Sequence, residues 1–113
     1  MRIAVASNGL DVADNFSTCQ NFNFFDTSAY EIVDTRNIPA DELTCDERVA
    51  LLDHLDTDAL VCGCVRADTK NDLSRRSVAV ASGFSGPAYT AAESYVNARA
   101  EELLADTPQE DDE

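Results

Sequence analysis

The sequence has few basic residues and no long apolar segment. Lys and Arg number 8 against 22 Asp and Glu, which leaves a formal charge of −14 over 113 residues. Because nucleic-acid backbones and anionic membrane surfaces are themselves polyanions, this imbalance argues against both as partners. No stretch approaches 18 consecutive apolar residues, so no transmembrane helix is expected. The first apolar run also meets Ser7–Asn8–Gly9 too early for a signal peptide. We therefore expect a cytoplasmic protein with free thiols.

The chain also lacks an internal repeat and an internal linker, and its length favours one domain. Apolar residues make up 44% of the sequence, close to the globular average, so a sizeable core can form. The carboxyl terminus is different, because residues 106–113 contain five acids and no base. We predict a folded domain over residues 1–104 and a disordered acidic tail over residues 105–113.

Apolar runs and turns in the first part of the chain predict three strands. Ile3–Ala6 is a short apolar run, and residues 7–20 form a long polar loop. Phe22–Phe25 and Tyr30–Val33 flank a short connection at Asp26–Ser28, which predicts an antiparallel hairpin.

Helices and strands alternate in the rest of the chain. Thr44 and Glu47 have the spacing of a capping box, which predicts the start of a helix. After it we predict a buried strand at 59–62, a weak helix at 66–74, a buried strand at 78–81, and a final helix opened by Ser85–Gly86–Pro87 that buries Ala88, Ala91, Ala92, Tyr95, Ala98 and Leu103.

The resulting order, βββαβαβα, predicts an α/β domain with a mixed five-stranded sheet and helices on its faces. This is the order of a ribonuclease-H-like three-layer fold, in which the second strand runs opposite to the other four. A nuclease of that kind needs carboxylates on its strands to hold two magnesium ions. Asp26 and Asp34 lie at strand ends, and the first strand carries no acid. We therefore expect no catalytic residues and no enzymatic activity.

Four cysteines carry most of the chemical information: Cys19, Cys45, Cys62 and Cys64. In the predicted topology each lies at the carboxyl edge of the parallel strands, where open α/β sheets bind ligands. Thiolates prefer iron–sulfur units, zinc or cuprous copper. Cys19 and Cys64 lie in loops, so we expect them to be the primary ligands of a metal or cluster. Cys62 is a weaker candidate for a metal ligand, and Cys45 is a weaker candidate for binding a cofactor.

Simpler interpretations of these residues remain open. Cys62 ends an apolar strand, where cysteine commonly fills the core, and Cys45 could be an inert surface thiol. His54, the only histidine, lies among acids and is expected to be exposed and not catalytic. The turn Ser82–Gly86 is better explained as the start of a helix than as an anion site. The whole chain could also be a cysteine-based redox sensor or an interaction domain without a cofactor.

Several segments together resemble one known family. Met1–Ser7 contains an Arg-Ile-Ala-Val-Ala strand, and Val12–Phe22 contains a loop with Asn-Phe-Ser-Thr-Cys. They are similar to the opening Lys-Ile-Ala-Val-Ala strand and the Val-Ser-x-His-Phe-Gly-His-Cys-x-x-Phe loop of the dinitrogenase iron–molybdenum cofactor biosynthesis family. Asp58–Gly63, and Ser85–Gly86 with the alanine-rich helix around Tyr95, resemble the later parts of that family. The resemblance covers roughly residues 1–104.

The resemblance implies a ribonuclease-H-like carrier or chaperone, an accessory protein of nitrogen fixation. Such a protein holds an iron–sulfur cluster or an iron–molybdenum cofactor precursor and passes it from a donor to a recipient protein. Cys19 matches the loop cysteine of the family. Asn15 and Thr18 stand where members often have His, and Cys64 stands near a usual Gly. The ligand set has therefore either moved toward cysteine, or metal binding has been altered or lost.

Overall fold

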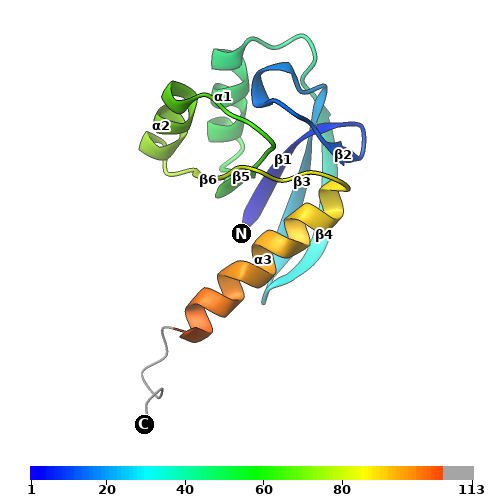
Figure 1. Ribbon diagram of the computed structural model, residues 1–113, viewed down its shortest axis with the longest axis vertical. Coiled ribbons are helices and arrows are strands. Elements are labelled where there is room, and N and C mark those ends of the chain that lie inside the picture. Colours follow the sequence, from blue (N-terminus) through cyan, green and yellow to red (C-terminus); the bar gives the residue numbers. More distant parts are fainter. Residues whose placement is uncertain (106–113) are drawn as a thin grey trace.

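The computed structural model describes residues 1–105 and contains one mixed sheet with helices on both faces (Figure 1). Its elements are β1 (Arg2–Asn8), β2 (Asp11–Val12), a 3₁₀ turn η1 (Phe16–Thr18), β3 (Asn21–Ser28), β4 (Glu31–Pro39), α1 (Cys45–His54), β5 (Ala59–Val61), α2 (Ala67–Arg75), β6 (Ala79–Ala81) and α3 (Ala88–Ala105). Apart from Ala105, the acidic tail predicted over residues 105–113 lies outside the described part of the chain. No helix within residues 1–105 is both long enough and apolar enough to cross a membrane.

The strand directions predicted from the sequence are confirmed. The sheet order is β4-β3-β1-β5-β6, with β3 antiparallel to β1 and β4, and with β5 parallel to β1 and β6. The predicted number of five strands is wrong, because a sixth strand, β2, pairs with the end of β1. Gly9 adopts a left-handed φ of +67° and turns the chain back, so Ser7 pairs with Val12 inside the predicted loop.

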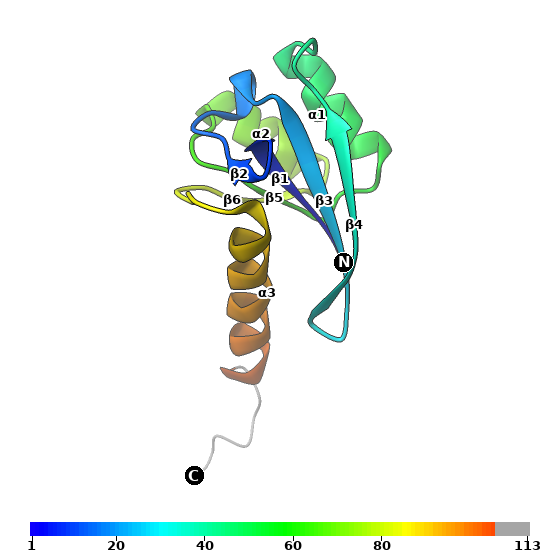
Figure 2. The same ribbon diagram turned by 90° about the vertical axis from the view of Figure 1, so that its right-hand side faces the viewer.

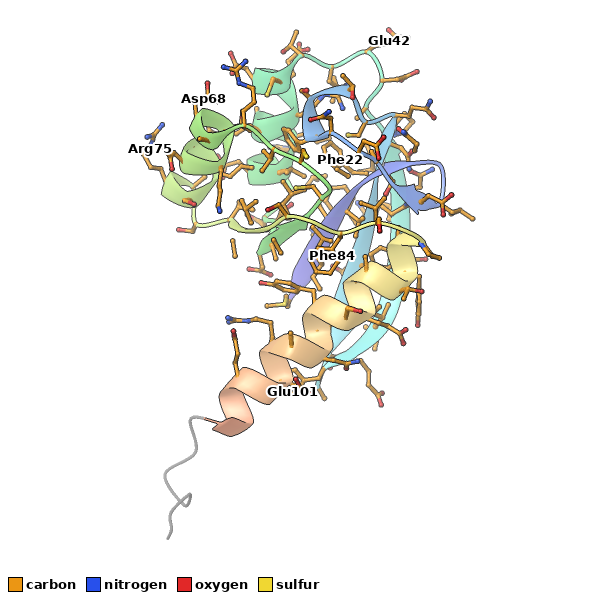
Figure 3. All side chains as sticks on the ribbon, viewed as in Figure 1. Phe22, Glu42, Asp68, Arg75, Phe84 and Glu101 are labelled. Carbon is orange, nitrogen blue, oxygen red and sulfur yellow. The ribbon has the colours of Figure 1, made fainter. Side chains whose placement is uncertain are left out.

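Alternation along β1 explains why its residues from Ile3 to Ser7 are all buried, with only Arg2 and Asn8 at its ends in contact with solvent. Ala4 and Ala6 point to the face covered by α1 and α2, whereas Ile3 and Val5 point to the face covered by α3. Figures 1 and 2 show the two helical layers on opposite sides of the sheet. The small alanines leave room on the α1 face for the rings of Phe16, Phe22 and Phe24. In Figure 3 the Phe22 ring lies in the interior, whereas Glu42 and Asp68 lie on the outer surface.

The predicted start of the first helix is confirmed, whereas the predicted hairpin turn lies at different residues. The capping box is present, because Glu47 N–H donates to Thr44 Oγ1 and Thr44 N–H donates to Glu47 Oε1. The hairpin turn is displaced from Asp26–Ser28 to Ala29 and Tyr30, whose φ values of 52° and 65° form a two-residue left-handed turn. The turn therefore lies just after the polar residues from which it was predicted.

Burial near the sheet edge and in the last helix differs from the prediction. β6 was expected to be buried, but it is an edge strand in which Ala79 is exposed. α3 begins at Ala88, one residue after Pro87, and its buried residues are Ala88, Ala91, Ala92 and Val96. Tyr95 is half-buried and Ala98 is exposed, because the helix leaves the sheet after Val96. The side chain of Leu103 lies outside the described part of the structure.

Candidate functional site

The segment Cys62–Cys64 continues β5 beyond its last paired residue and is held on both sides. Cys64 N–H donates to Asp14 O at 2.7 Å, and Phe16 N–H donates to Cys64 O at 2.9 Å. On the other side, Gly83 N–H donates to Gly63 O at 2.7 Å and Phe84 N–H donates to Cys62 O at 3.1 Å. The Cys-x-Cys turn is thus clamped between the loop after β2 and the loop after β6.

Glycine at position 63 is required by space. A Cβ added to Gly63 would lie 2.7 Å from both Ala13 O and Asp14 O, which are backbone atoms that cannot rotate away. Among the glycines, Gly63 is the one without a left-handed φ. Its role is therefore to let two backbones approach each other, and this approach closes the loop over the residues behind it.

The two cysteines of this turn have different environments. Cys64 is exposed at the carboxyl edge of the sheet, whereas Cys62 is fully buried in the core on the α1 face. Burial, together with the smaller effect of negative charge on Cys64 and Cys19, raises the pKa of the Cys62 thiol to about 11. Cys19 belongs to the same buried cluster on the α1 face as Cys62.

Cys19 is also fully buried, although it follows η1 in a loop. The Arg48 guanidinium, only 2% exposed, donates from Nη1 to Cys19 Sγ at 2.9 Å and to Cys19 O at 2.6 Å. Burial raises the pKa of the Cys19 thiol, while the charge and hydrogen bond of Arg48 oppose that rise. Cys19 is therefore tied to α1, and a ligand reaches its sulfur only if the loop moves.

Arg48 is the residue that the sequence did not identify. Within residues 1–105 its guanidinium forms no ion pair with a carboxylate, and its remaining bond is from Nε to Leu43 O at 3.2 Å. A buried cation beside a thiol, rather than beside one of many available acids, is an uncommon arrangement. In the sequence it follows Cys45–Glu47, where it is indistinguishable from an exposed helical arginine.

Cys45 is half-buried at the start of α1, and its sulfur lies 3.4 Å from Thr69 Oγ1 of α2. His54 is exposed at the end of α1, as predicted. All four cysteines are free thiols. Among the described residues, no three His, Cys, Asp or Glu side chains converge into a ready metal site. Cys19 and Cys62 thus share one buried cluster, and of the three cysteines Cys19, Cys62 and Cys64 only Cys64 is exposed.

No protein-family model matches this sequence, and no curated protein matches it. Solved structures do match. The crystal structure of PH0822 aligns with a TM-score of 0.81 and 11% identity over 87% of this chain and 90% of that chain. A provisionally named dinitrogenase from Methanocaldococcus jannaschii aligns with a TM-score of 0.72 and 13% identity over 87% and 89%.

A provisionally named NifB protein from Thermotoga, assigned to the DUF35 family, aligns with a TM-score of 0.69 and 20% identity over 87% of this chain and 89% of that chain. The names of these last two proteins relate them to nitrogenase. At such identities the alignments show a common arrangement of strands and helices, and this chain has the α/β fold of those structures over most of its length.

Proposed function

We propose that this protein is a non-enzymatic, cytoplasmic carrier with a ribonuclease-H-like domain. It would bind an iron–sulfur cluster or an iron–molybdenum cofactor precursor as cargo, receive it from a donor and deliver it to a recipient protein. The observation that carries the proposal is that Cys19 and Cys62 belong to one buried cluster, while Cys64, two residues after Cys62, is exposed. The nitrogenase-related names of two structural neighbours support the same cargo.

Cys64 is the entry ligand in this proposal, because it is the one exposed thiol of the three. Sulfur ligands match the soft preference of iron–sulfur units, and a metal can displace a thiol proton when it binds. Cys62 and Cys19 can join only when the loop around Ala13–Phe16 separates from the Cys-x-Cys turn, which would break the bonds of Cys64 with Asp14 and Phe16. Cargo binding would therefore be coupled to loop opening.

The test is anaerobic reconstitution of the full-length chain with ferrous iron and sulfide, followed by visible absorption and by iron and sulfide analysis. We expect broad visible bands and bound iron in the wild type, with large losses in Cys64→Ser and Cys19→Ser. Cys45→Ser is the matched control, because its sulfur is engaged with Thr69 between α1 and α2. If the wild type takes up no iron, or if Cys64→Ser and Cys19→Ser take up as much as the control, the proposal is wrong.

The same samples separate the other two functions considered. A redox sensor would form a disulfide on mild oxidation without visible bands. Burial raises the pKa of the Cys62 and Cys19 thiols, and both disulfide formation and metal ligation need the deprotonated form, so the visible bands are the observation that distinguishes the two functions. An interaction domain would neither bind iron nor form a disulfide.

A further inference from the structure

Strand β4 ends the sheet and has an open edge. Seven of its nine residues are exposed, and Ile32 and Ile38 are half-buried. β4 is the last strand of the sheet order and, among the described strands, pairs with β3 alone. An edge strand of this length normally carries features that block pairing, because its free backbone groups attract other strands. Here those features are a bulge at Val33, which has no partner on β3, and Pro39 at the far end.

The hydrogen-bond phase of β4 identifies which backbone groups are free. Ala40 N–H donates to Gln20 O at 2.8 Å, in register with the β3–β4 ladder. Because bonds in an antiparallel ladder alternate, Ile38 and Arg36 direct their backbone groups toward β3. Thr35 and Asn37 then direct their N–H and C=O groups outward. The segment between the bulge and Pro39 is therefore able to accept one more strand.

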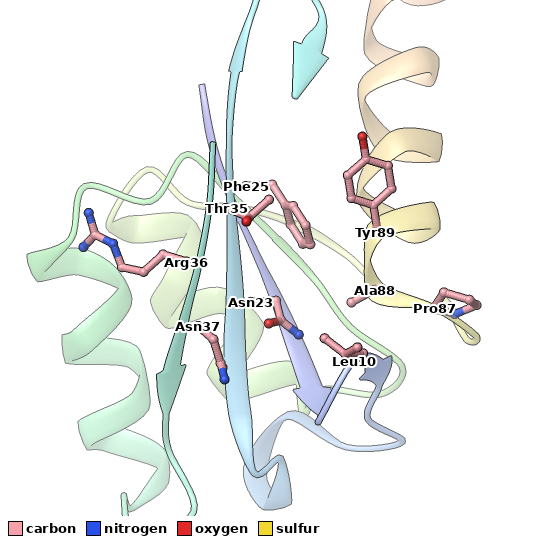
Figure 4. A pocket seen from close by; sticks show the side chains of 9 residues that line it. All are labelled: Leu10, Asn23, Phe25, Thr35, Arg36, Asn37, Pro87, Ala88 and Tyr89. Atoms are coloured by element: carbon pink, nitrogen blue, oxygen red, sulfur yellow. The ribbon is translucent and has the colours of Figure 1, made fainter. Parts of the chain in front are cut away.

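Exposed apolar side chains gather beside this edge. Of the five large hydrophobic residues that are exposed in the described structure, four lie near β4: Leu10, Tyr30, Val33 and Tyr89. Leu10, which is 80% exposed, and Tyr89 border a cavity of about 440 Å³. Thr35 and Asn37 of β4 line the other side of that cavity (Figure 4). The open edge and the apolar cavity thus form one surface, and no cysteine lines the cavity.

We propose that a second copy of this chain pairs antiparallel along β4, with Thr35 facing Thr35 of the second copy. In this register, Asp34 lies opposite Arg36 of the second copy, and Arg36 lies opposite Asp34. Within residues 1–105 neither side chain forms an ion pair. Opposite charges that face each other across a strand pair stabilise it. The outward N–H of Thr35 in each copy can donate to the outward C=O of Thr35 in the other copy. Val33 of the second copy lies opposite Asn37 of the first, which lines the cavity described above.

Self-complementary charge is the reason to choose a second copy over another protein. The net charge of −14 would favour a basic partner at long range, but in the segment of β4 between the bulge and Pro39 the charges of Asp34 and Arg36 balance, and Glu31 lies beyond the bulge at the start of the strand. Repulsion between two copies acts over distance and is screened by salt, whereas backbone bonds and contact pairs are less affected. Dimerisation should therefore strengthen as salt is raised. The pairing uses no cysteine and is independent of cargo binding.

Sedimentation velocity over a concentration series tests the proposal with the full chain at low and high salt. We expect a concentration-dependent dimer that is favoured by salt. Arg36→Asp should weaken it by about tenfold, because Asp34 then faces a second acid. The double variant Asp34→Arg/Arg36→Asp should restore association. Arg75→Asp, which makes the same charge change on the exposed face of α2, is the matched control and should behave as wild type.

Thr35→Pro provides a second disruption, since it removes an N–H that makes no bond to β3. Circular dichroism should show that this variant keeps the monomer fold while it loses the dimer. A monomer at every concentration and salt would overturn the proposal. So would equal weakening by Arg36→Asp and Arg75→Asp, or failure of the double variant to restore the dimer.

Discussion

Two regions of the molecule treat their polar groups in opposite ways. One is the thiol corner, formed by Cys19, Arg48 and the Cys62–Cys64 turn, and the other is the open edge of β4. In the thiol corner, the backbone groups of the turn are bonded on both sides, and two of three sulfurs are fully buried. Along β4, the outward groups of Thr35 and Asn37 face solvent, and Asp34 and Arg36 make no ion pair in the described structure. The cargo binding proposed at the corner would therefore require the protein to move, whereas the pairing proposed at the edge would require only a partner.

Adding one methyl group to a glycine should have a much larger effect in the thiol corner than beside the open edge. Gly63→Ala places a Cβ 2.7 Å from two backbone oxygens, so the clamped loop must shift, and we expect a cost of about 3 kcal/mol. Gly9→Ala meets no atom within 4 Å, and its left-handed φ should cost about 1 kcal/mol. Urea unfolding of both variants measures the difference.

Alkylation of the thiols in the folded Gly63→Ala variant sharpens the result. If the shift opens the corner, Cys19 and Cys62 should become reactive, while they stay protected in wild type and in Gly9→Ala. Equal costs for the two glycine variants would show that Gly63 is not the clamp.

Arginine substitutions give the next largest contrast. Arg48→Met removes the donor of Cys19 O and Leu43 O, leaving carbonyls without a partner in a buried region, for a cost of about 2 kcal/mol. Arg36→Met on the exposed strand should change stability by less than about 0.5 kcal/mol. Thermal unfolding of the two variants, which make the same chemical change, provides the measurement.

The Arg48→Met variant has a second signature. Arg48 opposes the effect of burial on Cys19, so its removal should raise the pKa of that thiol further. Thiolate absorbance as a function of pH would detect this, compared with the same variant carrying Cys19→Ala. An unchanged Cys19 titration would mean that the guanidinium does not act on the sulfur.

The sequence predicted the sheet better than the corner, for a physical reason. Strand identity follows from apolar runs such as Ile3–Ala6 and Ala59–Cys62, and strand direction follows from the lengths of the connections. Burial of Cys19 depends on a turn of 3₁₀ helix and on Arg48, which is 29 residues away along the chain. No local pattern encodes that meeting, so Cys19 was predicted to be an accessible loop ligand.

β6 shows the same limit at the sheet edge. Val78–Ala81 has the composition of a central strand, yet the strand is last in the sheet order and its first residue is exposed. Apolar composition reports that a segment pairs, but not how many neighbours it has. The turn at Ala29 and Tyr30 is also displaced from its predicted place, and the bulge at Val33 shifts the register by one residue near it.

Alkaline pH should weaken the corner through Cys62. Its pKa is raised to about 11 in the folded protein from 9.0, so the folded state holds this proton more tightly than the unfolded state. The resulting stability is complete below pH 9 and is lost as pH rises toward 11, by about 2 kcal/mol. Cys62→Ala lacks this loss and serves as the reference. Parallel stability curves for the two proteins between these pH values would contradict the buried thiol.

Acid should produce the smallest of these effects, at the exposed base of the β3–β4 hairpin. Arg2 Nε donates to Asp26 Oδ1 at 2.8 Å, and this bond lowers the pKa of the Asp26 carboxyl. A lowered pKa means that the stabilisation is present above the unfolded value near 4 and is lost as pH falls through the folded value. Because both side chains are about one-third exposed, solvent limits the contribution to about 0.5 kcal/mol. Asp26→Asn should therefore lose slightly less stability than wild type between pH 5 and acid unfolding, whereas Asp34→Asn, one strand further out and without an ion pair in the described structure, should follow the wild-type curve.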